Sequence, residues 1–525
     1  MQNCIEQHPL CGNENESFCP SRLLKLDAFR ESKDIMLVEP RSCEGIRYTT
    51  LSHCWGAESS PKLLRTTTAN MEAHRSHISF EDLPLTFKDA INLTRELGLS
   101  FLWIDSLCII QDSVQDWEQE ASLMGKVYAN SHCTLAASSS PDSSRGCRRY
   151  TSASTVVPHS RYVDITKNDI EIRIFEKRTL DWYQEFNKGP LKERGWTLQE
   201  RALSTRIVHF EESLILWECR TMKASSELPW FRMDTGDPPP LLLLNESGEA
   251  SRESPSVKLR EDWFKTVEDF TNRKLTKGRD RLPALDGLAQ RGKDLGRGDY
   301  LAGLWRADMP SALLWRTGAE YKSVDCSRPT DYRAPSWSWA SIQGPVMYDS
   351  QRISQADHLN EPERLTLECN FGNFVIKDAI VNHRTESSAG EISSGSIDAQ
   401  GDLWQMTTNH GTPTPETDWR YGKYMLLRSS SAAVLGILCP DVVSEVCDGD
   451  EIYFVSIRDD LEEPDRNGLP RDLFLQAQND SVRVYMGLGL VAVDGLDSTF
   501  RRVGLARYVR VDHSTTQTPR RFRII

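Results

Sequence analysis

The sequence lacks the features that mark membrane proteins, exported proteins and nucleic-acid binders. No purely apolar run is much longer than residues 241–244, whereas a membrane-spanning helix needs about 20 apolar residues. The first residues contain neither a basic segment nor an apolar one, so we expect no signal peptide. Basic residues are the scarcer charge, with 63 Lys and Arg against 76 Asp and Glu and a formal net charge of −13. An acidic chain without a long basic run is a poor candidate for binding nucleic acid or an anionic membrane surface.

Several catalytic and cofactor motifs are also absent. The sequence contains no GxxxxGK[ST] phosphate loop, no HExxH, no GxSxG and no paired CxxC. These absences exclude the simplest nucleoside triphosphatase, metalloprotease, hydrolase and dehydrogenase classes. Gly487 and Gly489 flank a leucine, but neither a third glycine nor a helix pattern follows, so we interpret this segment as a closely packed strand.

Cysteine is present in an odd number, 13, spread over a long chain. This pattern predicts reduced thiols in a cytoplasmic protein rather than a disulfide framework. The only cluster of metal-ligand residue types consists of Cys4, His8, Cys11 and Cys19. Pro9 interrupts any helix that would align the first three, and the spacing matches no common zinc site. We therefore predict an ordinary structural or disordered segment here and no metal site.

What the sequence does contain is enough apolar material for several folded domains. Of its 525 residues, 39% are hydrophobic and 14 are Trp, so a wholly disordered chain is excluded. A chain of this length is expected to form about two to four domains. The compositional shifts predict an N-terminal extension (1–45), an α/β domain (46–220), a linker (221–256), a helical region (257–345) and a C-terminal β-rich region (346–525).

Residues 47–138 alternate between strand and helix patterns. Residues 47–56 are β-rich and end at a glycine, and residues 83–99 carry apolar residues at helical spacing. The nearly continuous apolar run at 101–110 is typical of a strand buried on both faces, and residues 132–138 indicate a third strand. Between these two strands, Ser113 followed by acidic residues predicts a helix start. We therefore predict an α/β fold with a doubly wound, mostly parallel sheet.

Later segments predict insertions and further strands. We expect a hairpin at 162–175, a helix at 196–203 and two strands within 206–219. Residues 263–315 are helical in pattern, whereas 424–438, 451–457 and 482–493 indicate strands. The sheet with its insertions is thus expected to be followed by a helical segment and a β-rich region.

Polar residues near the ends of the predicted strands are the first candidates for a site. Asp105 lies where polar groups line the ligand crevice of an open parallel sheet, although it can equally cap a neighbouring turn. His53 and Cys54 are adjacent on a strand, so they point to opposite faces and cannot form a dyad. A pair of His53 with Cys108 or Cys133 requires neighbouring strands, and the alternative is that these thiols are buried and inert.

The segment 194–201 is the most informative one. Trp196 and Glu200 are four residues apart, and therefore lie on one helical face close to Gly195. A carboxylate beside an indole, near a crevice, can stabilise an oxocarbenium-like cation during cleavage of a glycosidic bond. The alternative is a surface Glu200 that pairs with Arg194 or Arg201, beside a buried tryptophan.

Five segments together resemble the HET (heterokaryon incompatibility) domain proteins of filamentous fungi. They lie in order at 48–56 (YTTLSHCWG), 83–90 (LPLTFKDA), 103–112 (WIDSLCIIQD), 124–137 and 194–201 (RGWTLQER). The segment 333–341 (RAPSWSWAS) and the preceding 303–305 (GLW) resemble the region often attached to such domains. The sequence is identified as a member of this family.

The resemblance implies a role in non-self recognition and regulated cell death after hyphal fusion. HET domains are regarded as distant relatives of TIR domains, so a TIR-like doubly wound fold is implied as well. In TIR enzymes that cleave NAD, a tryptophan precedes the catalytic glutamate by four residues, as Trp196 precedes Glu200 here. The resemblance thus implies that Glu200 is catalytic. The ligand-binding residues it implies are His53, Cys54, Trp55, Gly56, Asp105, Cys108 and Trp196.

Three functions stay open at this point. The domain cleaves NAD, which is then a substrate and not a cofactor. Alternatively, it is a non-catalytic module that self-associates or binds another incompatibility protein. Tryptophans that are expected to be exposed favour this alternative. Least supported is action on a small molecule of a metabolic pathway. The C-terminal half is a candidate sensor or inhibitory lid, and the protein is expected to be cytoplasmic, with no nucleic-acid partner and no membrane span.

Overall fold

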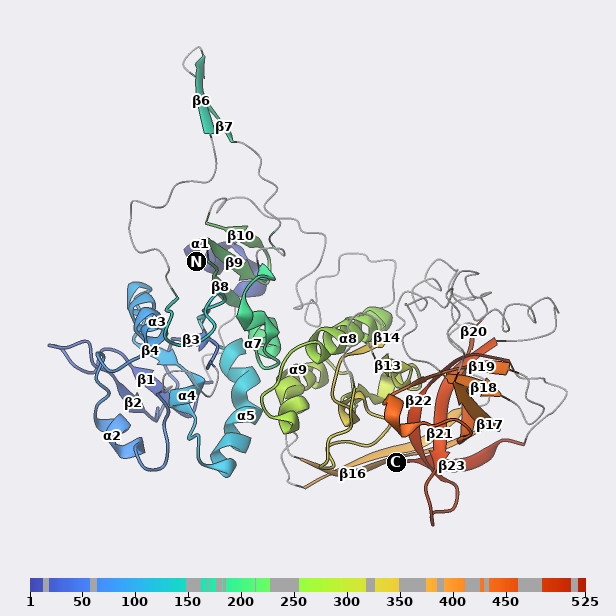
Figure 1. Cartoon of the computed structure of the whole chain (residues 1–525). Coiled ribbons are helices and arrows are strands. Elements are labelled where there is room, and N and C mark those ends of the chain that lie inside the picture. Colours follow the sequence, from blue (N-terminus) through green and yellow to red (C-terminus); the bar gives the residue numbers. More distant parts are fainter. Residues whose placement is uncertain are drawn as a thin grey trace. The chain divides into compact units, whose positions relative to one another are not determined.

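A computed structural model gives the fold of the chain (Figure 1). It describes residues 1–12, 18–56, 64–147, 162–167, 170–175, 182, 186–212, 214–226, 255–317, 326–348, 374–384, 391–410, 425–428, 434–460, 484–510 and 518–525. The chain divides into two compact units. The first comprises Met1–Asn245, Arg273–Leu275 and Pro283–Leu288, and the second comprises Glu246–Asn272, Thr276–Leu282 and Ala289–Ile525. Most of the linker expected at 221–256 falls outside the described residues.

An eight-stranded sheet organises the first unit, in the order β10-β9-β8-β5-β3-β4-β1-β2. Its strands are β1 (Leu23–Lys25), β2 (Met36–Val38), β3 (Tyr48–Ser52), β4 (Phe101–Trp103), β5 (Cys133–Ala136), β8 (Arg206–Phe210), β9 (Ile215–Cys219) and β10 (Lys223–Ser225). The four central strands are parallel, but both flanks are antiparallel. The prediction of an α/β fold is confirmed, whereas the prediction of a mostly parallel sheet is wrong. Short connections such as the one between β8 and β9 leave no room for a crossover helix and therefore enforce antiparallel pairing.

The parallel centre has the strand order β4-β3-β5-β8. Helix α3 (Leu85–Glu96) lies between β3 and β4 in the chain, α5 (Val114–Ala129) connects the segment after β4 to β5, and α7 (Thr197–Leu203) precedes β8. Strand β4 therefore pairs with one side of β3, and the next strand in the chain, β5, pairs with its other side. Such a reversal creates a crevice at the carboxyl ends of the two strands concerned, here β3 and β5.

The predicted strand 101–110 is wrong beyond Trp103. The chain leaves the sheet there and forms the short helix α4 (Asp105–Cys108), in which Asp105 Oδ1 accepts a hydrogen bond from the Ser106 amide at 2.7 Å. Leu107 and Cys108 are nevertheless fully buried. A short apolar run has the same composition in a buried strand and in a buried helical turn, so periodicity alone does not distinguish the two.

The helix start predicted at Ser113 is confirmed. Ser113 is the N-cap of α5, and its Oγ accepts a hydrogen bond from the Asp116 amide at 3.2 Å. The predicted hairpin is present as the antiparallel pair β6 (Tyr162–Lys167) and β7 (Ile170–Phe175). The expectation that all thiols are reduced is wrong for Cys19 and Cys43, which form a disulfide with a Cα–Cα distance of 5.2 Å. These cysteines flank the β1–β2 hairpin, whose antiparallel pairing brings them together.

Two helices begin the second part of the chain, α8 (Pro255–Thr271) and α9 (Pro283–Asp294). The helical pattern expected up to residue 315 is wrong after α9. The chain there forms the short strands β11 (Tyr300–Leu301), β12 (Leu304–Trp305) and β13 (Trp315–Thr317), the last of which pairs with β14 (Val346–Tyr348). The expectation of exposed tryptophans is also wrong here, because the indoles of Trp263, Trp305, Trp315, Trp337 and Trp339 are fully buried.

The β-rich C-terminal region is confirmed as a nine-stranded sheet (orange to red in Figure 1), in the order β15-β16-β23-β22-β19-β18-β17-β20-β21. Its strands are β15 (Val375–His383), β16 (Ile392–Gly401), β17 (Leu403–His410), β18 (Met425–Arg428), β19 (Val434–Pro440), β20 (Glu451–Asp460), β21 (Val484–Ala492), β22 (Thr499–Arg510) and β23 (Arg520–Ile524). An additional pairing of β21 with β22 closes six of them into a ring. The close packing expected at Gly487 is confirmed, because a Cβ there would lie 1.9 Å from the Val455 carbonyl oxygen. Within the described part of the chain, no helix combines the length and the apolar character needed to cross a bilayer.

Candidate functional site at the carboxyl ends of the central strands

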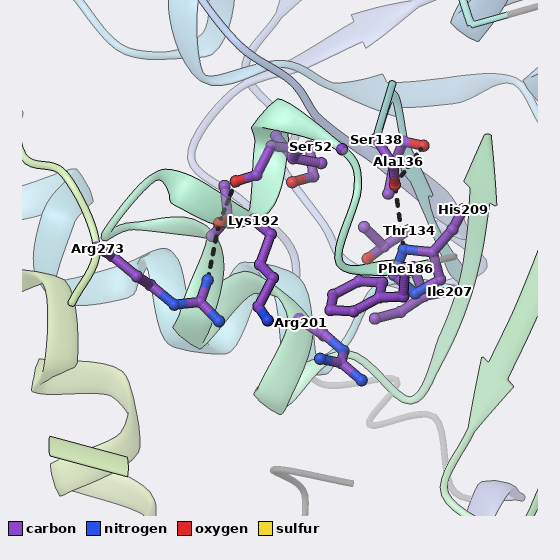
Figure 2. Close-up of a pocket in the computed structure, with 13 residues that line it drawn as sticks. Ser52, Thr134, Ala136, Ser138, Phe186, Lys192, Arg201, Ile207, His209 and Arg273 are labelled. Atoms are coloured by element: carbon purple, nitrogen blue, oxygen red, sulfur yellow. Dashed lines mark hydrogen bonds between the residues drawn. The ribbon is translucent and has the colours of Figure 1, made fainter. Parts of the chain in front are cut away.

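A pocket of about 380 Å³ opens in the first unit (Figure 2). It is lined by Ser52, Thr134, Ala136, Ser138, Phe186, Gly189, Leu191, Lys192, Thr197, Arg201, Ile207, His209 and Arg273. Ser52 is the last residue of β3 and Ala136 is the last residue of β5. The pocket therefore reaches the crevice between these two strands, where ligands of open α/β sheets bind.

The carboxyl group of Glu200 is buried next to this pocket. Glu200 lies on α7, only 5% of it is exposed, and its Oε2 accepts a short hydrogen bond from the Ser52 hydroxyl. Burial raises the pKa of Glu200 to about 7, and the hydrogen bond from Ser52 only partly counteracts this effect. At neutral pH the carboxyl group is thus poised between its protonated and ionised forms.

A chain of hydroxyl groups fixes α7 against the sheet. The Ser204 hydroxyl donates to the Glu200 carbonyl oxygen at 2.6 Å and lies 2.6 Å from the Thr134 hydroxyl. Thr134 in turn lies 2.7 Å from the Thr50 hydroxyl on β3. Because all of these side chains are buried, each bond replaces a contact with water that burial removed. The position of Glu200 above the strand ends is therefore determined by the sheet itself.

Trp196 does not join Glu200 in the pocket. It is the N-cap residue of α7 and packs edge-to-face against Trp117 on α5, with a centroid distance of 6.2 Å. The four-residue spacing to Glu200 is present on the helix, but the indole contributes to the hydrophobic core. Trp196 is not among the residues that line the pocket.

The segment after β3 forms a second polar group around Asp105. The Trp55 indole donates to Asp105 Oδ2 at 2.8 Å, and His53 Nδ1 lies 3.8 Å from Asp105 Oδ1. Burial lowers the pKa of His53 to about 4, so its imidazole is neutral at physiological pH. The His53 carbonyl oxygen accepts a hydrogen bond from Arg194 Nη1 at 2.7 Å. The structure thus brings His53, Trp55 and Asp105 together, with Arg194 between this group and the segment that precedes α7.

The two candidate thiols are buried and protonated. Burial raises the pKa of Cys54 to about 11 and that of Cys108 to about 12. Because the thiolate is the reactive form, neither residue is a nucleophile in this state. Gly56 lies at the exposed end of the segment with a φ of +87°, a conformation that favours glycine. None of the eight site residues predicted from the sequence is among those that line the pocket.

The pocket instead contains a polar network that no sequence motif indicated. His209 on β8 has Nδ1 3.3 Å from the Ser138 hydroxyl and Nε2 3.3 Å from Glu218 Oε2 on β9. Arg201 binds the same carboxylate through two nitrogens at 2.7 and 2.9 Å. Burial alone would raise the pKa of Glu218, but the charge of Arg201 and the bond from His209 outweigh it and hold this pKa well below its usual range. The only indication of this network in the sequence is that His209 and Glu218 are polar residues within the otherwise largely apolar strands β8 and β9.

Basic side chains at the pocket favour an anionic ligand. Lys192 and Arg273 line it together with Arg201, and Figure 2 shows all three side chains. Arg273 Nη1 donates to the Thr197 hydroxyl at 3.2 Å, which orients the guanidinium group. The guanidinium group of Arg201 binds the Glu218 carboxylate. Lysine and arginine side chains are the usual protein ligands of phosphate groups.

A family comparison matches this part of the chain. Residues 48–200 match the family model described as Heterokaryon incompatibility protein (HET). These residues form a HET domain. The matched residues run from the start of β3 to Glu200, so they include both partners of the Ser52–Glu200 hydrogen bond. His209 and Glu218 lie beyond the matched residues of the HET domain. Comparisons with curated proteins and with solved structures give no match.

Proposed function

We propose that this protein acts in heterokaryon incompatibility, the fungal recognition of non-self that ends in regulated cell death, and that its HET domain cleaves NAD as TIR-like enzymes do. The observation that carries the catalytic part is the buried Glu200 carboxyl group, held by Ser52 at the carboxyl ends of the central strands. The match over 48–200 supports the general role. We further propose that the protein works in the cytoplasm through self-association or another incompatibility protein.

The reaction that fits Glu200 is hydrolysis of the bond between nicotinamide and ribose. As the C–N bond breaks, positive charge develops on the ribosyl carbon, and a nearby carboxylate stabilises it. A buried carboxylate does this better than an exposed one, because little water screens its charge. Water then adds to the ribosyl carbon and releases a proton, while Lys192 and Arg273 provide positive charge for the diphosphate group.

The test is a nicotinamide-release assay on the purified full-length chain incubated with NAD. We expect the Glu200→Gln variant to release nicotinamide about 10²- to 10³-fold more slowly than wild type, the loss typical of removing one charge-stabilising group. Glu120→Gln is the matched control, because Glu120 is also a buried carboxylate of the HET domain but bonds to Arg22, the residue before β1. The control should keep wild-type activity. Absence of nicotinamide release from wild type, whatever its oligomeric state, would refute the catalytic proposal.

A non-catalytic signalling module is the second candidate. It is favoured by one observation: Glu200 does not line the pocket, so a ligand there meets Ser52 first. In this case, cells that produce Glu200→Gln should die as wild-type cells do, and light scattering should show the same oligomer for both proteins. Loss of toxicity in Glu200→Gln, with an unchanged oligomer, would exclude this candidate.

A further inference from the structure

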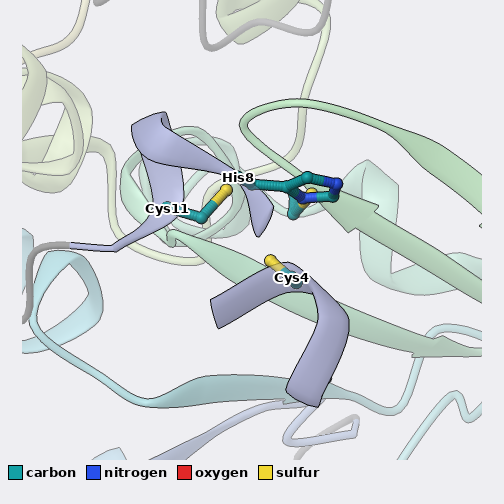
Figure 3. Close-up of side chains that lie close together, drawn as sticks. Cys4, His8 and Cys11 are labelled. Atoms are coloured by element: carbon teal, nitrogen blue, oxygen red, sulfur yellow. The ribbon is translucent and has the colours of Figure 1, made fainter. Parts of the chain in front are cut away.

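Four metal-ligand side chains converge at the N-terminal end of the chain, outside the HET domain. They are Cys4, His8, Cys11 and Cys219, and their ligand atoms all lie within 4.8 Å of one another. The three cysteines are at most 3% exposed, and His8 is partly buried. Figure 3 shows the side chains of Cys4, His8 and Cys11 gathered from two short helical turns. The sequence predicts an ordinary structural or disordered segment and no metal site here, yet the fold brings Cys4, His8 and Cys11 together.

Pro9 argues against a metal site in the sequence, but in the structure it begins the turn that brings these side chains together. Helix α1 (Gln2–Gln7) ends before His8, which is extended with φ −106° and ψ 100°. The 3₁₀ turn η1 (Pro9–Cys11) then reverses the chain and brings Cys11 back towards Cys4. Arg206 secures this turn, because its Nη2 donates to the Cys11 carbonyl oxygen at 2.5 Å and its Nη1 to the His132 carbonyl oxygen at 3.0 Å.

The fourth ligand, Cys219, comes from a distant part of the sequence rather than from Cys19. Cys19 is engaged in the disulfide with Cys43. Cys219 is the last residue of β9, and the β9–β10 hairpin carries it to the N-terminal turns. More than two hundred residues separate it from Cys11, so no local spacing rule reveals the set.

We propose that Cys4, His8, Cys11 and Cys219 bind one zinc ion in a tetrahedral Cys₃His site. Zinc–sulfur and zinc–nitrogen bonds of about 2.3 and 2.0–2.1 Å place neighbouring ligand atoms of a tetrahedron about 3.6–3.8 Å apart. Cys219 Sγ lies 3.5 Å from His8 Nδ1. All four ligand atoms lie within 4.8 Å of one another, close to the separations of a tetrahedral site.

The surroundings supply the hydrogen bonds that zinc-bound thiolates require. The Met222 amide donates to Cys219 Sγ at 3.4 Å, and the Thr221 hydroxyl lies 3.7 Å from Cys11 Sγ. Three thiolates and a zinc ion carry one net negative charge. Two arginines place positive charge nearby, because Arg206 donates to the Cys11 carbonyl oxygen and Arg220 to that of Leu10. Such outer contacts orient ligands and stabilise their charged form.

The site is structural, because all four positions of the tetrahedron are occupied by protein ligands. It connects the first eleven residues to the β9–β10 hairpin at the edge of the sheet. A six-residue helix such as α1 is too short to be stable alone in water. The apolar cluster around it is small, consisting of the three cysteines with Trp217 and Met222. Zinc binding would therefore supply most of the stability of this terminal segment.

The experiment is metal analysis of the full-length protein, purified without chelators. We expect about one zinc ion per chain in wild type by plasma mass spectrometry, and its loss in Cys11→Ser and Cys219→Ser. Cys447→Ser is the matched control, because Cys447 is an exposed cysteine of the second unit, and this variant should keep its zinc. Zinc that persists in both ligand variants would overturn the proposal.

Two further measurements keep the test decisive if a ligand variant misfolds. His8→Cys retains a complete set of ligands and should keep one zinc ion per chain, whereas His8→Ala should bind it more weakly. Cobalt added to the metal-depleted wild type should give the sulfur-to-cobalt charge-transfer absorption of a tetrahedral thiolate site. A folded wild type without zinc, in which mass spectrometry finds two of the three cysteines as a disulfide, would refute the site.

Discussion

At the scale of single residues, burial determines the proton affinity of Glu200. The pKa of this carboxyl group is raised from 4.5 to about 7. The folded protein therefore holds a proton that the unfolded chain has already released between these two pH values. As pH rises through this range, ionisation of Glu200 lowers the free energy of unfolding. Above pH 7 this decrease reaches its full value of about 3 kcal/mol.

We expect the Glu200→Gln variant to be more stable than wild type at pH 8, by up to about 3 kcal/mol, and equally stable near pH 4.5. The amide has the size of the carboxyl group and still accepts the hydrogen bond from Ser52, but it carries no charge. Urea unfolding at both pH values measures the difference. A variant that is less stable than wild type at pH 8 would contradict the raised pKa.

Glu218 provides the control of opposite sign. Its pKa is held low, because the bonds from Arg201 and His209 outweigh its burial. Glu218→Gln should therefore be less stable than wild type at neutral pH, since it leaves a buried arginine without its partner.

The sequence predicts individual side chains of the site only in part. The spacing of Trp196 and Glu200 correctly indicated one helix, and the position of Glu200 near the strand ends follows from that helix preceding β8. That Trp196 would turn to Trp117 depends on packing between two helices, which one sequence does not show. Likewise, His209 and Glu218 become partners only through the pairing of β8 with β9.

At the scale of elements, the first unit depends on a close approach of two helices. A Cβ on Gly125 of α5 would lie 2.6 Å from the Cα of Gly287 and 3.1 Å from Leu203 Cδ1. Gly287 belongs to the part of α9 that lies in the first unit, and its amide donates to Gln199 Oε1 at 3.2 Å. Any side chain at either glycine would separate the backbones and weaken this bond.

We expect Gly125→Ala to destabilise the protein, by about 1–3 kcal/mol, as overpacking of a core does. Helix propensity alone predicts the opposite, a gain of about 1 kcal/mol. Ser122→Ala on the same helix is the control, because its hydroxyl bonds to the Gln119 carbonyl oxygen at an exposed position, and it should be neutral or slightly stabilising. Thermal unfolding of both variants decides between the two effects. A higher melting temperature for Gly125→Ala would refute the close contact.

Elements were predicted well where a local signal begins or ends them. The helix that starts at Ser113 is such a case, because a capping hydroxyl defines its first turn. The run 101–110 is the opposite case, because nothing local in an apolar segment says whether it continues in the sheet. The antiparallel flanks of the sheet were missed for the same reason, since strand direction depends on which strands meet.

At the scale of the whole molecule, a buried ion pair connects distant segments of the second unit. Arg502 on β22 and Asp441 are both fully buried, and two guanidinium nitrogens lie 3.0 Å from the two carboxylate oxygens. The same guanidinium group donates to the carbonyl oxygens of Leu313 and Trp315, each at 2.5 Å. The six-stranded ring is thereby joined to β13, which lies far from β22 in the sequence.

We expect Asp441→Asn to destabilise the second unit by about 3–5 kcal/mol, because it leaves a buried cation without its counter-charge. Asp398→Asn is the control on the same sheet: Asp398 binds Arg523 with similar geometry, at 2.6 and 3.1 Å, but both side chains are exposed. Its effect should stay below about 1 kcal/mol. Scanning calorimetry of the full chain measures both, and equal shifts for the two variants would contradict the expectation.

The order of strands in the second unit has a consequence for its folding during synthesis. Strand β23 lies between β16 and β22, so within the described sheet β16 is hydrogen-bonded to the ring strands through residues 520–524 of β23. On the ribosome, β16 is complete at Gly401, but its partner does not emerge until the intervening chain has been translated. Throughout that interval, one side of β16 presents unpaired amide and carbonyl groups. The nascent chain should therefore depend on chaperones most strongly between these two points.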